Sequence, residues 1–253
     1  MSRRKIEGSI ALVTGANRGI GRAITEALLE RGARKVYATA RDPKTLEALK
    51  QRHGSRVVVL RLDVTRSDQI ADIAQQAPDV ELLFNNAGVV EPGELSSEAI
   101  VDHARREMEV NYFGPLRLLQ RFADTLVRRG GALVVISSTA ALTSVPIVPT
   151  YSASKAALHS LTQAWRVLFS ARGVAVLGAY PGPVDTDMTK GYPLEKASPR
   201  DVAKAILDGI EAGDEDIFPD PFALAFGQQF HSSPKSSERQ MAASGLPLSK
   251  GAE

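Results

Sequence analysis

The chain has 253 residues, no cysteine, and 31 basic against 29 acidic side chains, for a formal charge of +2. The lack of cysteine excludes a disulfide scaffold, a thiolate nucleophile and a cysteine-ligated metal. The near balance of charge gives no support for nucleic-acid binding, and the four histidines lack metal-ligand spacing, so we expect neither function. The apolar runs are too short for a signal peptide or a membrane span, which predicts a cytoplasmic protein.

Short runs rich in valine, isoleucine and leucine recur along the chain and predict strands. Their apolar character is continuous, which is typical of strands covered on both faces of a parallel sheet. The predicted strands are residues 10–13, 36–39, 57–62, 80–84, 133–136 and 174–180, with a short final strand at 217–218.

Amphipathic segments between these runs predict helices at residues 20–31, 68–76, 97–127, 150–172 and 201–211. The long third helix is expected to break or bend around Gly114-Pro115. The alternation of strands and helices predicts an α/β fold, a doubly wound Rossmann-type parallel sheet of six to seven strands flanked by helices.

No linker or change of composition divides the chain before about residue 185. We therefore expect a single catalytic domain over residues 1–226. Within it, a loop at 187–198 contains glycine and proline and is expected to close over substrate. A polar C-terminal extension follows over 227–253, and its last dozen residues are expected to be mobile.

A glycine motif follows the first predicted strand directly and opens the first predicted helix. Glycine lets bare backbone approach a pyrophosphate, and the helix N-terminus offers free N–H groups. This strand–turn–helix context favours dinucleotide binding over a simple tight turn. The residues expected to contact the cofactor here are Gly15, Asn17, Arg18, Gly19, Ile20 and Gly21.

Tyr151 and Lys155 are four residues apart, so on a helix they share one face. A free tyrosine has a pKa of about 10, and an ammonium group nearby is expected to lower it. Ser138 lies at the carboxyl end of a predicted strand, where ligands bind in open α/β sheets. A Tyr-x-x-x-Lys pair alone is usually a surface pair, but together with Ser138 and the glycine motif it favours catalysis.

Four further segments accompany the G-x-x-x-G-x-G spacing in a fixed order: Asn-Asn-Ala-Gly at 85–88, Ser-Ser at 137–138, Tyr-Ser-Ala-Ser-Lys at 151–155 and Pro-Gly-Pro-Val-Asp-Thr at 181–186. Together they resemble the short subtype of the short-chain dehydrogenase/reductase family. The resemblance covers about residues 6 to 190 and is poor beyond. It implies a nicotinamide cofactor and catalysis by Ser138, Tyr151 and Lys155.

The same resemblance implies that Asn111 holds a water that relays protons to Lys155. The alternative is that Asn111 is only a polar residue that bends its helix. The further cofactor contacts that the family implies are Asp63, Val64, Asn86, Ala87, Gly88, Tyr151, Lys155, Pro181, Gly182, Val184 and Thr186.

The residue at the end of the second strand indicates which nicotinamide cofactor is used. Sites that prefer NAD place an acid there to bind the ribose 2′-hydroxyl, but this chain has Ala40 followed by Arg41. A guanidinium group suits a 2′-phosphate, and Arg18 could approach the same phosphate, so the sequence predicts NADP(H). The alternative is a charged loop in which Asp42 still binds the ribose.

The sequence thus predicts an NADP(H)-dependent oxidoreductase that reduces a ketone or aldehyde, or oxidises the matching secondary alcohol, with Tyr151 as general acid/base. A regulator that senses NADP without turnover, a 3-oxoacyl-thioester reductase, and an epimerase or dehydratase are weaker alternatives. The helices at 97–127 and 150–172 resemble those that pair subunits in the family, so a homodimer or homotetramer is expected. The expected pocket wall indicates an apolar substrate: Val89, Val90, Ala140, Leu142, Val145, Pro183 and the loop 187–198.

Overall fold

Seven parallel strands form one sheet in the computed structural model, which describes residues 4–91 and 95–243. Their order is β3-β2-β1-β4-β5-β6-β7. Strands β2 and β3 are thus added on one side of β1 and strands β4 to β7 on the other, so the strand order switches between β1 and β4. This confirms the predicted doubly wound sheet, and the switch point marks where such sheets bind ligands. The strands are β1 (Ile10–Thr14), β2 (Lys35–Ala40), β3 (Val57–Arg61), β4 (Leu82–Asn85), β5 (Ala132–Ile136), β6 (Ala175–Ala179) and β7 (Asp216–Ile217).

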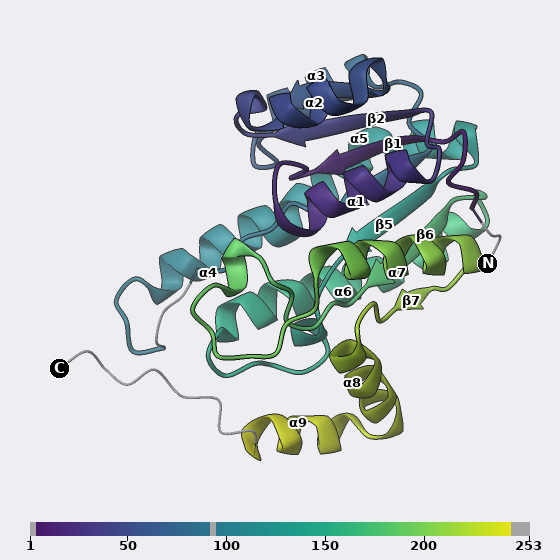
Figure 1. Ribbon diagram of the computed structural model, residues 1–253. Helices are drawn as coiled ribbons and strands as arrows, with labels where there is room; N and C mark the ends of the chain where they lie inside the picture. The colour runs from purple at the N-terminus through teal and green to yellow at the C-terminus, as the bar shows by residue number, and fades with distance from the viewer. Residues whose placement is uncertain (1–3, 92–94, 244–253) are drawn as a thin grey trace.

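Helices cover both faces of the sheet. One face packs against α1 (Gly19–Glu30), α2 (Glu47–His53) and α7 (Pro199–Ala212), and Figure 1 shows α1 and α7 side by side in front of the strands. The other face packs against α3 (Ser67–Gln76), α5 (Gly114–Arg129) and α6 (Pro149–Ser170). Alternate residues of strands β1 to β6 enter the two apolar cores, which is why these strands are mostly apolar.

The long helix predicted at 97–127 is interrupted. It comprises α4 (Ile100–Met108), a π-helical turn (Glu109–Phe113) and α5. The interruption thus lies just before Gly114-Pro115. Pro115 lies directly after the π-helical turn, where the irregular hydrogen bonding accommodates a residue without an N–H. Gly114 packs on Val64, because a Cβ there would lie 2.9 Å from Val64 Cγ2.

Three α-helices were not predicted from the sequence: α2, which a 3-10 turn (Pro43–Leu46) precedes, and, in the C-terminal region, α8 (Pro221–Ser232) and α9 (Pro234–Ala243). The predicted boundary at residue 226 falls inside α8. Both C-terminal helices carry a start signal that the sequence analysis did not use, Asp220-Pro221 and Ser233-Pro234. The mobility predicted for the last dozen residues concerns mainly 244–253, which lie outside the described residues.

Across the described ranges, no helix is both long and apolar enough to span a membrane. The described part of the chain also contains no group of three or more histidine, aspartate or glutamate side chains that could bind a metal ion.

Candidate active site

The glycine turn between β1 and α1 has the backbone conformation that its sequence predicts. Gly15 (φ +66°) and Gly19 (φ +53°) both lie in the left-handed region that favours glycine. A Cβ on Gly21 would collide with the Gly15 carbonyl, so that glycine serves close packing within the turn. The Asn86 side chain fastens the turn to the end of β4, since Nδ2 donates to the Thr14 carbonyl at 2.8 Å.

A cleft of about 790 Å³ opens above this turn, at the switch point of the sheet. It presents bare backbone at the N-terminus of α1, as a bound pyrophosphate requires. Pro181, Gly182 and Val184 line the neighbouring cavity instead. The other residues predicted to bind the cofactor all line the cleft: Gly15, Asn17, Arg18, Gly19, Ile20, Gly21, Arg41, Asp63, Val64, Asn86, Ala87, Gly88, Tyr151, Lys155 and Thr186.

The far end of the cleft, after β2, contains two arginines in different situations. Arg41 is exposed and forms no ion pair within the described ranges, whereas Arg18 Nη1 lies 2.9 Å from Asp187 Oδ2. The Asp42 carboxylate accepts from the Lys44 N–H at 3.1 Å and caps the following 3-10 turn. Arg41 is therefore the cation best placed for an anionic group at this end of the cleft.

The side chains predicted to be catalytic lie at the opposite end. Tyr151 and Lys155 lie one turn apart near the start of α6, and Ser138 is the second residue after β5. Tyr151 lines both the cleft and the neighbouring cavity, which also contains Ser138. Lys155 is 4 % exposed, and its Nζ donates to the Ile136 carbonyl at 2.9 Å.

Burial dominates the ionisation of this tyrosine–lysine pair. It raises the pKa of Tyr151 to about 12, and hydrogen bonding with Ser138 opposes that rise. Burial also lowers the pKa of Lys155 to about 8. In this structure burial outweighs any lowering of the Tyr151 pKa by Lys155, whose Nζ donates to the Ile136 carbonyl and lies 5.8 Å from the centre of the Tyr151 ring. The predicted effect of the Lys155 ammonium on Tyr151 stays a prediction.

Asn111 is fully buried in the π-helical turn, and its side chain is held on both sides. Its Oδ1 accepts from the Val89 N–H at 2.9 Å, while its Nδ2 donates to the Val89 carbonyl and to Ser154 Oγ, each at 2.9 Å. The side chain therefore fixes the segment after β4 beside α6. The proton-relay role of Asn111 stays a prediction.

Glu107 is a buried residue near the site that the sequence analysis missed. It is 0 % exposed, and its Oε1 accepts from the Glu91 N–H at 2.8 Å, whereas Oε2 has no partner among the described residues. Burial raises the pKa of Glu107, and the charge of Glu107 adds to the rise in the pKa of Tyr151. The sequence did offer one indication that Glu107 lies near the site. Glu107 is four residues before Asn111, and in a helix this spacing places both side chains on one face.

Glu107→Gln is expected to stabilise the protein at neutral pH. Because the pKa of Glu107 is raised on folding, its contribution to stability is full below the unfolded pKa and is lost as pH rises through the folded pKa. The variant stays neutral, so its unfolding free energy should exceed that of the wild type by about 1 kcal/mol at pH 7.5 and match it at pH 4. Urea denaturation at both pH values measures this, with the exposed Glu98→Gln as control. A gain of equal size at pH 4 would contradict the assignment.

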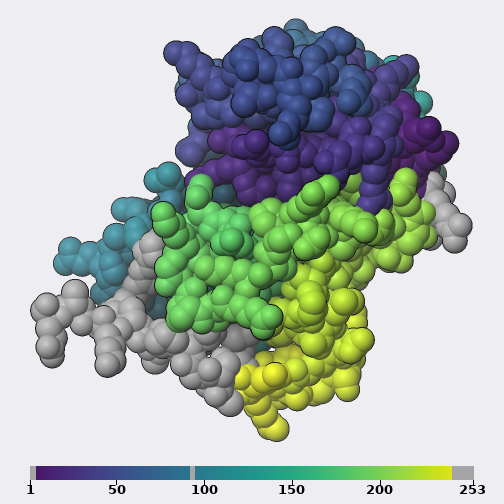
Figure 2. All heavy atoms as spheres, viewed as in Figure 1, coloured from purple at the N-terminus to yellow at the C-terminus, as the bar shows by residue number. Residues whose placement is uncertain are grey.

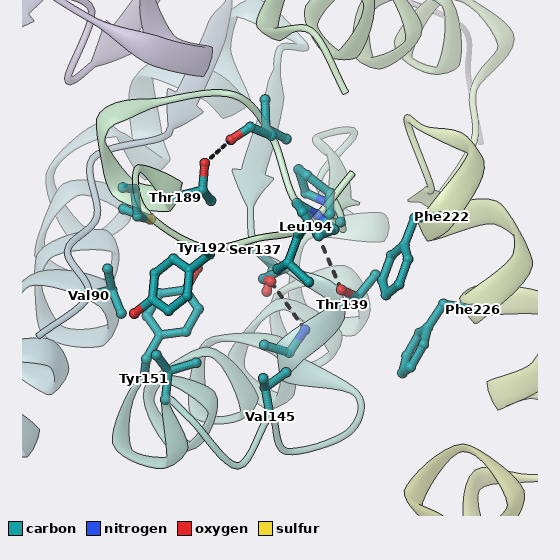
Figure 3. A pocket seen from close by; sticks show the side chains of 18 of the residues that line it. Val90, Ser137, Thr139, Val145, Tyr151, Thr189, Tyr192, Leu194, Phe222 and Phe226 are labelled. Atoms are coloured by element: carbon teal, nitrogen blue, oxygen red, sulfur yellow. Dashed lines mark hydrogen bonds between the residues drawn. The ribbon is translucent and has the colours of Figure 1, made fainter. Parts of the chain in front are cut away.

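A second cavity, of about 480 Å³, begins at Ser138 and Tyr151. Figure 3 shows Tyr151 and Tyr192 on one side of it, and Phe222 and Phe226 on the other. The described residues that line it include no charged side chain. Four residues of the predicted wall are present: Val90, Ala140, Val145 and Pro183.

Other parts of the predicted wall are placed differently. Val89 faces the cofactor cleft, and Leu142 lines neither cavity. The loop 187–198 contributes Met188, Thr189, Tyr192 and Leu194. Helices α8 and α9, which the sequence analysis missed, also line this cavity, through Phe222, Ala225, Phe226, Gln229, Ser237 and Gln240. In Figure 2 the C-terminal helices, in yellow, lie below and to the right of the segment that carries this loop, in green.

Comparison with known proteins identifies the family. The family model for short chain dehydrogenases matches residues 9–197. An uncharacterised oxidoreductase of Staphylococcus aureus (strain MW2) is 34 % identical over 210 residues, which cover 78 % of this chain and 89 % of that protein. This chain belongs to the short-chain dehydrogenase/reductase family and is an oxidoreductase of it.

Two solved structures share the fold over nearly the whole chain. A short chain dehydrogenase from Burkholderia cenocepacia J2315, in complex with NADP, is 36 % identical with a TM-score of 0.88, covering 94 % of this chain and 99 % of its own. A short chain dehydrogenase/reductase from Burkholderia phymatum, in complex with NAD, is 25 % identical with a TM-score of 0.80, and the match covers 92 % of this chain and 96 % of its own.

Proposed function

We propose that this protein is an NADP(H)-dependent oxidoreductase that reduces an uncharged, apolar ketone or aldehyde, or oxidises the matching secondary alcohol. The observation that carries the proposal is the position of Tyr151, which lines both the cleft above the glycine turn and the apolar cavity. A proton donor in that position reaches a substrate carbonyl from the side on which the cofactor binds.

The three catalytic side chains have distinct roles in this proposal. NADPH, when bound, supplies the hydride for the carbonyl carbon. The Ser138 hydroxyl donates to the carbonyl oxygen and orients it, and Tyr151 transfers its proton to the same oxygen. The Lys155 ammonium stabilises the resulting phenolate, and in the oxidative direction Tyr151 takes the proton back.

The preference for NADP(H) over NAD(H) rests on the end of the cleft that contains Arg41. Arg41 is free to bind a 2′-phosphate, while the Asp42 carboxylate is engaged as a helix cap. The relative from Burkholderia cenocepacia in complex with NADP, which is the more similar of the two solved structures described, is consistent with this preference.

The alternatives fit this site less well. A 3-oxoacyl-thioester reductase binds an acyl group on a phosphorylated carrier, but the described lining of the apolar cavity offers no lysine or arginine. A regulator that senses NADP has no need to keep Ser138, Tyr151 and Lys155 together.

Two exposed apolar side chains on α6, Val167 and Leu168, support the pairing of copies of this chain, and we propose a homodimer or homotetramer.

The function is tested by measuring NADPH consumption with ketones, aldehydes, 3-oxoacyl thioesters and steroids. Reduction of apolar ketones or aldehydes at rates well above the substrate-free control would support the proposal. Tight NADPH binding without turnover on any of these would favour the regulator, and exclusive reduction of thioesters would favour the carrier-dependent enzyme.

The ionisation of Lys155 predicts how ketone reduction depends on pH. Because burial lowers the pKa of Lys155 to about 8, this group loses its charge just above neutrality, whereas Tyr151, with a pKa of about 12, keeps its proton. We therefore expect kcat/KM for NADPH, at saturating ketone, to be level from pH 6 to 7 and to fall above about pH 8. A profile that stays level to pH 9.5 would contradict this role of the Lys155 charge.

A further inference from the structure

We propose that the first two turns of α8 form an aromatic subsite of the substrate cavity, which selects ketones carrying a flat aromatic ring beside the carbonyl group. The two phenylalanines of this subsite, Phe222 and Phe226, lie beyond the segment that the family model matches. The inference rests on the proposed function and specifies its substrate.

A buried carboxylate fixes the start of α8 to the active site. Asp220 is 4 % exposed, and its two oxygens have different partners. Oδ1 accepts from the Ala223 N–H at 2.8 Å and caps α8, while Oδ2 accepts from the Gly182 N–H at 2.8 Å. Gly182 belongs to the segment that follows β6 and lines the same cavity. One side chain therefore fixes where α8 lies relative to the catalytic residues.

The glycine at position 182 lets Phe222 approach closely. A Cβ added to Gly182 would lie 2.5 Å from Phe222 Cδ1 and 2.9 Å from Asp220 Oδ1. Any larger residue would therefore push α8 away from the cavity. Gly182 was predicted to bind cofactor, but these contacts show that it accommodates the helix that carries the subsite.

The two phenylalanine rings line the same wall of the cavity and lie parallel to each other. They are one helical turn apart, nearly parallel at 12°, with ring centres 6.1 Å apart. Phe226 is 8 % exposed, but Phe222 is 48 % exposed although it lines the cavity. Figure 3 shows both rings across the cavity from Tyr151 and Tyr192. A half-exposed aromatic side chain at a cavity wall provides contact area for a ligand.

The chemistry of the wall limits what this surface binds. Carboxylates and phosphates are disfavoured, because the described lining includes no cation. A volume of about 480 Å³ suits a ligand of modest size, and aromatic rings gain from offset or edge contacts beyond simple burial. An aryl ketone satisfies both conditions, with its oxygen at Ser138 and Tyr151 and its ring toward α8.

Three ketones with eight carbons each separate ring recognition from simple apolar burial: acetophenone, cyclohexyl methyl ketone and 2-octanone. Phe226→Leu keeps apolar volume but removes the ring. It should lower kcat/KM for acetophenone about tenfold while changing that for 2-octanone less than twofold. The matched control, Phe230→Leu, makes the same substitution on α8 at a residue that does not line the cavity, and should change neither value. An equal loss for all three ketones would overturn the inference.

Binding is measured separately from turnover by saturation-transfer NMR of acetophenone on the full chain, with and without NADP⁺. Weaker binding to Phe226→Leu than to wild type and Phe230→Leu supports the subsite, even if no ketone is reduced and the proposed function fails. If ketones are reduced but acetophenone shows no dependence on Phe226, the proposed function stands and the aromatic subsite is wrong. Absence of acetophenone binding to the wild type also overturns the subsite.

Discussion

Tyr151→Phe is expected to lower kcat for ketone reduction about 1,000-fold while NADPH still binds with nearly unchanged affinity. The substitution removes one oxygen from the side chain that lines both cavities, and the ring remains to fill its place. Ser137 and Thr186 also line both cavities, but their aliphatic hydroxyls are far weaker acids than a phenol, so neither is expected to replace Tyr151 as proton donor. Steady-state kinetics with a responsive ketone, together with an NADPH binding titration, measures both effects.

The matched control is Tyr192→Phe, which removes a hydroxyl from the same cavity at a residue of the loop 187–198. It should keep kcat within a few-fold of the wild-type value. Turnover by Tyr151→Phe within tenfold of wild type would mean that another group donates the proton.

Arg41→Glu is expected to lower kcat/KM for NADPH about 100-fold and to leave that for NADH unchanged or higher. Arg41 is an exposed cation at the end of the cleft after β2, with no ion pair among the residues described. Replacing it with a carboxylate removes a partner of the 2′-phosphate and adds repulsion, whereas NADH carries a hydroxyl at that position.

Two further variants separate a local contact from a general charge effect. Arg61→Glu reverses an exposed charge at the end of β3, outside the described lining of the cleft, and should leave the ratio of the two cofactors unchanged. Arg18→Ala should reduce use of NADPH less than Arg41→Glu, because Arg18 is already paired with Asp187. An Arg41→Glu enzyme that still prefers NADPH by the wild-type ratio would contradict the assignment.

The sheet and the cofactor cleft were predictable because their signals are local. An apolar run followed at once by Gly15, Gly19 and Gly21 specifies a strand, a turn and a helix within a dozen residues. The Tyr151–Lys155 spacing likewise depends only on helix geometry. Most predicted strand and helix bounds differ from the structure by a few residues, since hydrogen bonding and not composition decides where each element ends.

The features that sequence reasoning missed depend on contacts between distant segments. Asp220 holds Gly182 across 38 positions, and no local pattern around either residue indicates that pair. The buried state of Glu107 depends on the backbone of Glu91, and the pKa of Tyr151 depends on how deeply the fold encloses it. The helix α8 was missed because it is short and its second half, from Gln228 on, is mostly polar.

The π-helical turn at Glu109–Phe113 has a consequence for how this chain tolerates insertions and deletions. A π turn contains one residue more than an α-helical turn, so the segment beyond it is rotated by about 100° relative to an uninterrupted α-helix. Asn111 thereby holds the segment after β4, while Phe122 on the same continuous helix packs into the core. Deleting one residue here would keep the helix but rotate either Asn111 away from the segment after β4 or Phe122 away from the core. The number of residues between Asn111 and Phe122 is therefore constrained, whatever the types of those residues.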